Sequence, residues 1–252
     1  MRADHAKQWI DRVAANPRFL FTAKLWQKFT HDAIVIPASI TAEDDRTVRA
    51  GFDVLQKGGK LGAMLLQFPF SFHRNKQSTA YLEELLRRFA DYPLAVEVRH
   101  ASWNDAEIFA ILRERGVAFC NIDQPAIGKS LEPSAEVTST IGYVRFHGRR
   151  YDTWFSDDAT VPSFERYNYL YSAAELEPWA QRIETVAERA RDVFVVTNNH
   201  YLGKGVVNAL QLISLLTNSK VDVPESLRQQ YPELEEIASQ PPEAPTLFPV
   251  KK

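Results

Sequence analysis

The sequence is nearly devoid of cysteine and has no long hydrophobic run. Cys120 is the single cysteine among 252 residues, which excludes an internal disulfide and favours a reducing compartment. It follows the apolar residues Val117, Ala118 and Phe119, so we expect a buried, unreactive side chain. No stretch approaches the ~18 consecutive apolar residues of a membrane span. The first residues carry no apolar secretion signal, and we therefore expect a cytoplasmic protein.

Strong net charge and the familiar catalytic motifs are absent as well. The net charge of −2 and the pI of about 6.3 argue against a general polyanion-binding protein. The chain has no Walker A sequence, no G-x-S-x-G elbow, no H-E-x-x-H and no dinucleotide-binding glycine pattern. The glycine cluster within residues 58–62 leads into a predicted strand and does not follow one, which indicates a turn.

What the chain does contain is a repeated alternation of apolar runs and helix-period segments, which is typical of βα units around a parallel sheet. Near-continuous apolar character indicates strands that are covered on both faces. The six predicted strands are 19–24, 61–67, 93–99, 116–123, 141–147 and 192–198. The predicted helices are 41–57, 78–89, 105–115, 172–191 and 206–217.

The proline content divides the chain into two parts. Residues 1–218 are predicted to form one α/β domain, and the proline-rich residues 219–252 a C-terminal tail. The aromatic and polar segment 151–171 has no clear period and is predicted to be a long loop.

Polar side chains share one face near the C-terminal end of nearly every predicted strand, because side chains alternate faces along a strand. They are Lys24, Gln67, Glu97, Arg99, Asn121, Asp123, Arg145, His147 and Asn198. In a two-layer sheet both faces meet helices, and burying such charges is costly. In a barrel the inner face opens into a cavity that polar groups can line, so the pattern favours a barrel. Two plainer alternatives stay open: a structural ion-pair cluster of Glu97, Arg99 and Arg145, and a hydrogen-bonded core histidine at 147.

Taken as an ordered set, several segments resemble the DUF72 (YecE-like) family, which are (β/α)8 TIM-barrel proteins of uncharacterised function. The matching segments are 21–24 with 30–31, 61–69, 95–100 with 102–103, 143–149, 198–200 and 208–209. The family pattern starts with two strands whose motifs this sequence does not contain. The resemblance therefore implies that the six runs are strands 3–8, and that the first two βα units are missing.

The polar set suggests an enzyme acting on a small polar or anionic substrate at the C-terminal mouth of the barrel. Lys24, Arg99 and Arg145 are candidates to hold a phosphate or carboxylate. Glu97 or His147 is the candidate acid/base, with Asp123 orienting His147. Further substrate-binding candidates are Gln67, Trp103, Asn198 and Asn199.

Three alternatives remain. No cofactor is predicted, but a divalent metal held by Glu97, Asp123 and His147 is one variant. Nucleic-acid or nucleotide binding is another, because Arg145, Arg149 and Arg150 lie near Tyr151 and Trp154 in the sequence. A shortened chain without independent function is the third.

Overall fold

A computed structural model describes residues 1–32, 34, 40–152 and 162–239. The described chain divides into two compact units. The first comprises Met1–Arg145 and Thr185–Val195, and the second comprises Phe146–Glu184 and the chain from Val196 onward.

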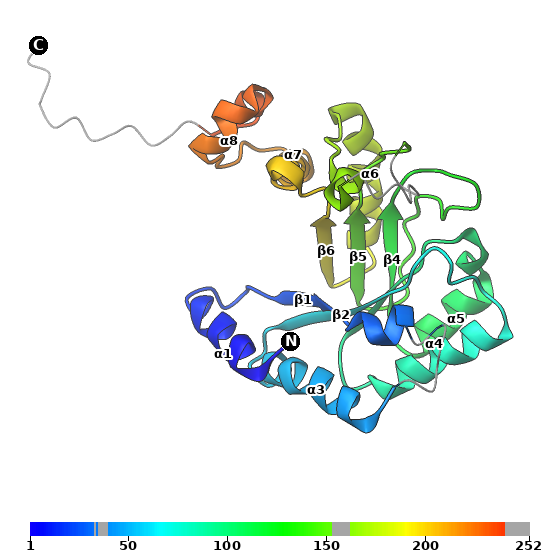
Figure 1. Cartoon of the computed structure of the whole chain (residues 1–252). Helices are drawn as coiled ribbons and strands as arrows, with labels where there is room; N and C mark the ends of the chain where they lie inside the picture. The colour runs from blue at the N-terminus through cyan, green and yellow to red at the C-terminus, as the bar shows by residue number, and fades with distance from the viewer. Residues whose placement is uncertain (33, 35–39, 153–161, 240–252) are drawn as a thin grey trace, which may run out of the picture. The chain divides into compact units, whose positions relative to one another are not determined.

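Six strands form one sheet, in the order in which they occur along the chain. The pairs β1–β2, β2–β3 and β3–β4 are parallel, and Figure 1 shows β4, β5 and β6 side by side with their arrowheads pointing the same way. Each strand lies within a run predicted from the sequence. Their bounds are β1 Phe21–Lys24, β2 Leu61–Gln67, β3 Leu94–Glu97, β4 Ala118–Asp123, β5 Ile141–Phe146 and β6 Asp192–Thr197.

Contacts across the sheet show that it curls. Adjacent strands lie ~4.8 Å apart, so β1 and β5, four positions apart, would be about 19 Å apart in a flat sheet. Nevertheless the Tyr143 hydroxyl of β5 donates a hydrogen bond to Thr22 Oγ1 of β1 at 3.0 Å. The fold is therefore an α/β fold around a curled six-stranded sheet, and it is TIM-barrel-like.

A helix follows each strand except β4, as the sequence predicts. The α-helices that accompany the strands are α1 Ala3–Arg12, α3 Ala42–Lys57, α4 Lys76–Arg88, α5 Ala106–Glu114, α6 Ala173–Ala187 and α7 Lys204–Thr217. The capping box predicted at Thr41 and Asp44 is present. A second capping box, formed by Asn75 and Ser78, starts α4 two residues before its predicted beginning. Gly116 follows α5 with φ of +63° and ends it as expected.

The core of the first unit consists of the apolar residues that the patterns identified. Ala63, Leu66 and Val96 of the strands are almost fully buried, as are Leu85 and Leu112 of α4 and α5. Cys120 is also fully buried, which confirms the sequence prediction, and desolvation raises the pKa of its thiol.

The described part of the predicted tail is folded. It contains α8 (Glu225–Gln230) and η6 (Pro232–Glu236), and its Tyr231 and Leu234 form a small hydrophobic core with Val207 of α7. The predicted boundary at residue 218 stays a prediction. The predicted loop 151–171 contains η4 (Ser163–Tyr167), and its residues 153–161 lie outside the described residues. In the described ranges, no helix is long and apolar enough to cross a membrane.

Candidate functional site

Four polar side chains of the first unit meet at the C-terminal ends of its strands. Lys24, Gln67 and Glu97 are the last residues of β1, β2 and β3. Gln67 and Glu97 are opposite each other in the parallel register. Arg145, near the end of β5, donates from Nη1 to Gln67 Oε1 at 2.9 Å. The curl of the sheet thus brings together residues that the alternation of faces had placed on one side of separate strands.

Glu97 is the centre of this cluster. It has no exposed surface. Arg99 Nη2 donates to its Oε1 at 3.0 Å, and Arg145 Nη1 donates to its Oε2. Each carboxylate oxygen is therefore engaged by a different arginine. The ion-pair cluster that the sequence left open is present in the structure.

Arg145 is 3% exposed and is held in place by these bonds. Burial acts to lower the pKa of its guanidinium, but Glu97, together with Cys120 and Tyr143, acts in the opposite direction, and the pKa is raised. Its Nε is buried and has no hydrogen-bond partner in the part of the chain that the structure describes. Arg145 is thus a permanent buried cation with one donor unused.

Lys24 lies at the edge of the cluster, where it lines a cavity of about 290 Å³. The cavity is also lined by Gln67, Thr30, His31, Trp26 and Gln27. Among the described residues the Lys24 ammonium has no hydrogen bond and no ion pair within 4.0 Å. Desolvation and the positive charges of Arg145 and Arg99 lower its pKa, against an opposite effect of Glu97.

His31 is the site residue that the polar pattern did not identify. It belongs to η1 (Lys28–Asp32), a π-helical turn that follows β1, and its Nδ1 lies 3.0 Å from Thr30 Oγ1. Burial and the positive charge of Arg99 lower its pKa below the ordinary value of 6.5, which makes the ring neutral at neutral pH. The alternation of faces along a strand gives no expectation for His31, because this residue lies in the turn after β1. Its signal in the sequence was its position in the DUF72-like segment at 30–31.

Two other predicted site residues of the first unit are buried. Asp123 ends β4 and has no exposed surface. Trp103 also has none: its indole N–H donates to the Phe72 carbonyl, and its ring stacks on Phe72 at 4.9 Å. Trp103 thus packs in the hydrophobic core and fixes the loop that carries Phe72.

The second unit holds the remaining predicted residues. His147 is fully buried, and its Nδ1 lies 3.4 Å from Asn198 Nδ2. Asn199 donates from Nδ2 to the Tyr169 carbonyl at 2.8 Å and to Asn208 Oδ1 at 2.7 Å. Asn208 in turn bonds both the N–H and the carbonyl of Tyr171. We call Asn199 and Asn208 the amide pair; it ties two segments of main chain together.

The residues proposed for metal and nucleic-acid binding have other partners. In the described part of the chain, no group of three or more His, Cys, Asp or Glu is arranged to hold a metal ion. Arg149 forms an ion pair with Glu175, and Arg150 forms ion pairs with Asp152 and Glu165. Trp154, the predicted stacking residue, lies outside the described residues.

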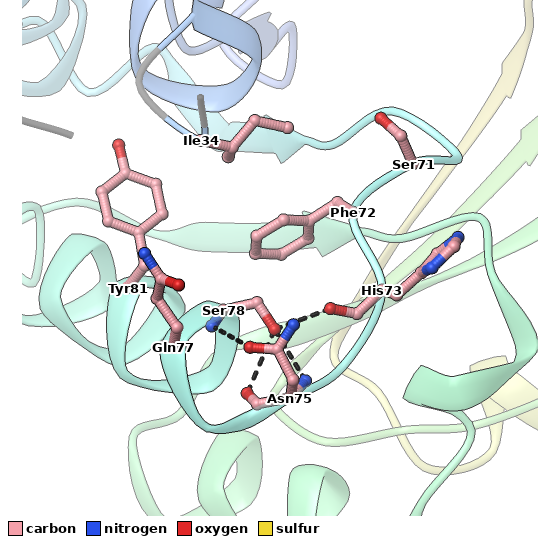
Figure 2. Close-up of a pocket in the computed structure, with 8 residues that line it drawn as sticks. All are labelled: Ile34, Ser71, Phe72, His73, Asn75, Gln77, Ser78 and Tyr81. Atoms are coloured by element: carbon pink, nitrogen blue, oxygen red, sulfur yellow. Dashed lines mark hydrogen bonds between the residues drawn. The ribbon is translucent and has the colours of Figure 1, made fainter. Parts of the chain in front are cut away.

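A second cavity of the first unit, of about 210 Å³, lies at the start of α4 (Figure 2). Figure 2 shows that Asn75 and Ser78 bond each other there, and Ser78 Oγ also donates to the His73 carbonyl at 2.7 Å. These polar groups form hydrogen bonds in the first turn of the helix. The described residues that line the cavity include no lysine or arginine. It is therefore a weaker candidate than the cavity beside Lys24.

Fold and site together define a class: a TIM-barrel-like α/β protein with a cationic cluster at the C-terminal ends of its strands. The family model "Protein of unknown function DUF72" matches residues 1–233. The chain belongs to the DUF72 family.

Similar proteins agree with this assignment. The UPF0759 protein YunF of Bacillus subtilis is 29% identical over 224 residues, covering 85% of this chain and 78% of that protein. A crystal structure of a DUF72 protein from Thermotoga maritima is 31% identical with a TM-score of 0.75, covering 84% of this chain and 79% of the other. A DUF72 protein from Enterococcus faecalis is 25% identical with a TM-score of 0.76, covering 89% and 84%.

Proposed function

We propose that the protein is an enzyme that binds a small anionic substrate, a carboxylate or a phosphate, in the cavity beside Lys24. The observation that carries the proposal is Lys24, which has no ionic or hydrogen-bonding partner among the described residues and lies near two arginines. The charges that act on Lys24 are those of Arg145, Arg99 and Glu97, so cations outnumber carboxylates in this part of the strand ends. Like charges held together in a partly buried site bind an anion that offsets their repulsion.

Glu97 has a positioning role in this proposal. Because an arginine engages each of its oxygens, Glu97 orients two guanidinium groups and takes up part of their charge. Acid/base chemistry by Glu97, His147 and Asp123 stays a prediction. So do substrate contacts from Gln67, Trp103, Asn198 and Asn199, a divalent metal, and the cytoplasmic location that the single cysteine favours.

Titration with inorganic phosphate, followed by calorimetry, tests the proposal. A hydrogen bond to a charged group contributes about 1.5–3 kcal/mol, so Lys24→Met is expected to weaken phosphate binding at least about tenfold. Lys57→Met, which removes an exposed lysine from the last turn of α3, is the control with the same change in net charge. Equal weakening in both variants, or no phosphate binding by the parent chain, would contradict the proposal.

We further propose that the six strands are strands 3–8 of a (β/α)8 barrel. Two observations support this: the side-chain contact across the sheet from β5 to β1, and the end positions of β1 and β6 in the strand order, which leave two edges that further strands can pair with. A chimera in which two further βα units precede β1 is expected to unfold at a higher temperature than this chain. An unchanged or lower unfolding temperature would argue against the proposal that two further strands complete a closed barrel.

A further inference from the structure

Two lysines near the end of β1 differ sharply in their surroundings. Lys28 Nζ donates to both oxygens of Asp44 at 2.8 Å, and it also lies 5.4 Å from the centroid of the Trp26 ring. Lys24, four residues earlier, lines the cavity and has no ionic or hydrogen-bonding partner among the described residues. Lys28 is therefore fixed as a structural cation, whereas the amine of Lys24 is available to a molecule in the cavity.

The surroundings of Lys24 lower its pKa, so a larger share of its amine is unprotonated than in an ordinary lysine. Desolvation, Arg145 and Arg99 all lower its pKa. A neutral lysine amine is a nucleophile toward carbonyl carbon, and neighbouring cations are one of the ways in which proteins produce it. The same arginines favour an anionic group nearby, because guanidinium groups bind carboxylate and phosphate well.

A group able to transfer protons lines the same cavity. His31 is neutral at neutral pH, since burial and Arg99 lower its pKa. A neutral imidazole accepts a proton at one nitrogen and donates one from the other. It is therefore suited to the proton transfers that accompany attack by an amine.

We propose that Lys24 forms an imine with a small carbonyl compound that carries a carboxylate or phosphate group. This rests on the proposed function, because the anionic group holds the compound in the cavity. Lys24 is then the catalytic nucleophile, His31 the proton-transfer group, and Arg99 and Arg145 supply the positive charge that favours the anion.

The step balances without an oxidant or reductant. The amine lone pair forms a C–N bond, and the carbonyl π pair moves to oxygen, which takes up a proton. His31 carries that proton from the nitrogen, which gives a carbinolamine. His31 then carries the second nitrogen proton to the hydroxyl group, which leaves as water while the nitrogen lone pair forms the second C–N bond. A C=N bond remains, so amine and carbonyl give imine and water.

Reductive trapping tests this proposal on the full chain. Pyruvate represents carbonyl compounds with a carboxylate, and dihydroxyacetone phosphate represents those with a phosphate. Each probe is incubated with the protein and sodium borohydride. The modified lysine is then located by peptide mass spectrometry. The lowered pKa of Lys24 gives it a larger share of free amine at neutral pH than an ordinary lysine has, so Lys24 is expected to be modified faster than any other lysine. The class of probe that gives the faster modification identifies the anionic group.

Two variants sharpen the experiment. Lys24→Arg retains the charge but cannot form an imine, and selective modification is expected to disappear. Lys28→Arg is the matched control, and its modification at Lys24 is expected to match that of the parent chain. Modification spread evenly over exposed lysines, or none at Lys24 with either probe, overturns the proposal. If phosphate binding persists in that case, only imine formation has failed; if phosphate binding is absent too, the proposed anion site has failed with it.

Discussion

The cationic cluster of the first unit and the amide pair of the second unit use polar residues in different ways. In the cluster, Glu97, Arg99, Arg145 and Gln67 bond one another side chain to side chain. The amide pair bonds main-chain groups at Tyr169 and Tyr171. Main-chain bonding by buried amides stabilises the fold itself. A charged cluster beside a cavity is suited to ligand binding when one of its lysines, here Lys24, has no ionic partner among the described residues.

Glu97→Gln is expected to have the largest effect on stability. The substitution keeps the shape of the side chain but leaves two arginines, one of them deeply buried, with no carboxylate between them. Removing one partner of a buried ion pair costs about 3–5 kcal/mol, and we expect a loss near 3 kcal/mol in urea unfolding.

The control for this variant is Glu43→Gln, which breaks the exposed ion pair with Arg46. It should change the free energy of unfolding by less than about 1 kcal/mol. A similar loss of unfolding free energy in the two variants would contradict the expectation that a buried ion pair costs more to break than an exposed one.

Asn208→Ala tests the amide pair. It removes the partner of the Tyr171 N–H, of the Tyr171 carbonyl and of one Asn199 amide hydrogen. Buried polar groups left without partners cost about 1–3 kcal/mol, so we expect a loss near 2 kcal/mol and no change in phosphate affinity. Gln211→Ala, one turn along α7, removes a single bond to Asn208 and is the matched control. If Asn208→Ala weakened phosphate binding in a protein that remains folded, the amide pair would contribute to ligand binding as well as to the fold, against the contrast drawn above.

Lys24→Met is expected to stabilise the protein slightly, whereas Glu97→Gln and Asn208→Ala are expected to destabilise it. The pKa of Lys24 is lowered in the folded state, so the folded chain binds this proton less tightly than the unfolded chain does. Lys24 therefore destabilises the fold below its folded pKa, and the effect disappears as the pH rises above its ordinary value of 10.5. We expect a small rise in the unfolding temperature at pH 7 and none at about pH 11, measured by circular dichroism. A fall at pH 7 would mean that Lys24 is engaged in a stabilising contact.

The smallest expected effect concerns Asp44, the partner of Lys28. Hydrogen bonds from Lys28 and Thr41 lower the pKa of Asp44 from 3.8 to about 2. Its contribution to stability is therefore complete above pH 3.8 and is lost as the pH falls through about 2. Asp44→Asn should flatten the fall in unfolding temperature between pH 4 and pH 2, as measured by differential scanning calorimetry. Parallel curves for the parent and the variant would contradict the assignment.

Much of the site was predictable from residue alternation along the strands. Lys24, Gln67, Glu97 and Arg145 were expected to share one face, and the structure brings them together. The same reasoning did not separate residues that bond the main chain, such as Asn199, from those beside a cavity. It also missed His31, because a side chain on a turn has no face assigned by strand alternation.

The sequence by itself determined the six strands, their alternation with helices, the capping box at Thr41 and the family. These depend on local periodicity and on short-range bonds, which are readable residue by residue. Only the tertiary structure decided which charged side chains form ion pairs and which one, Lys24, has no ionic partner among the described residues. Arg145 and Glu97 are 48 residues apart and Tyr143 and Thr22 are 121 apart, and contacts over such separations exist only once the sheet has curled. The contrast between Lys24 and Lys28 has the same origin, because it depends on which acidic side chain the fold brings within reach of each amine.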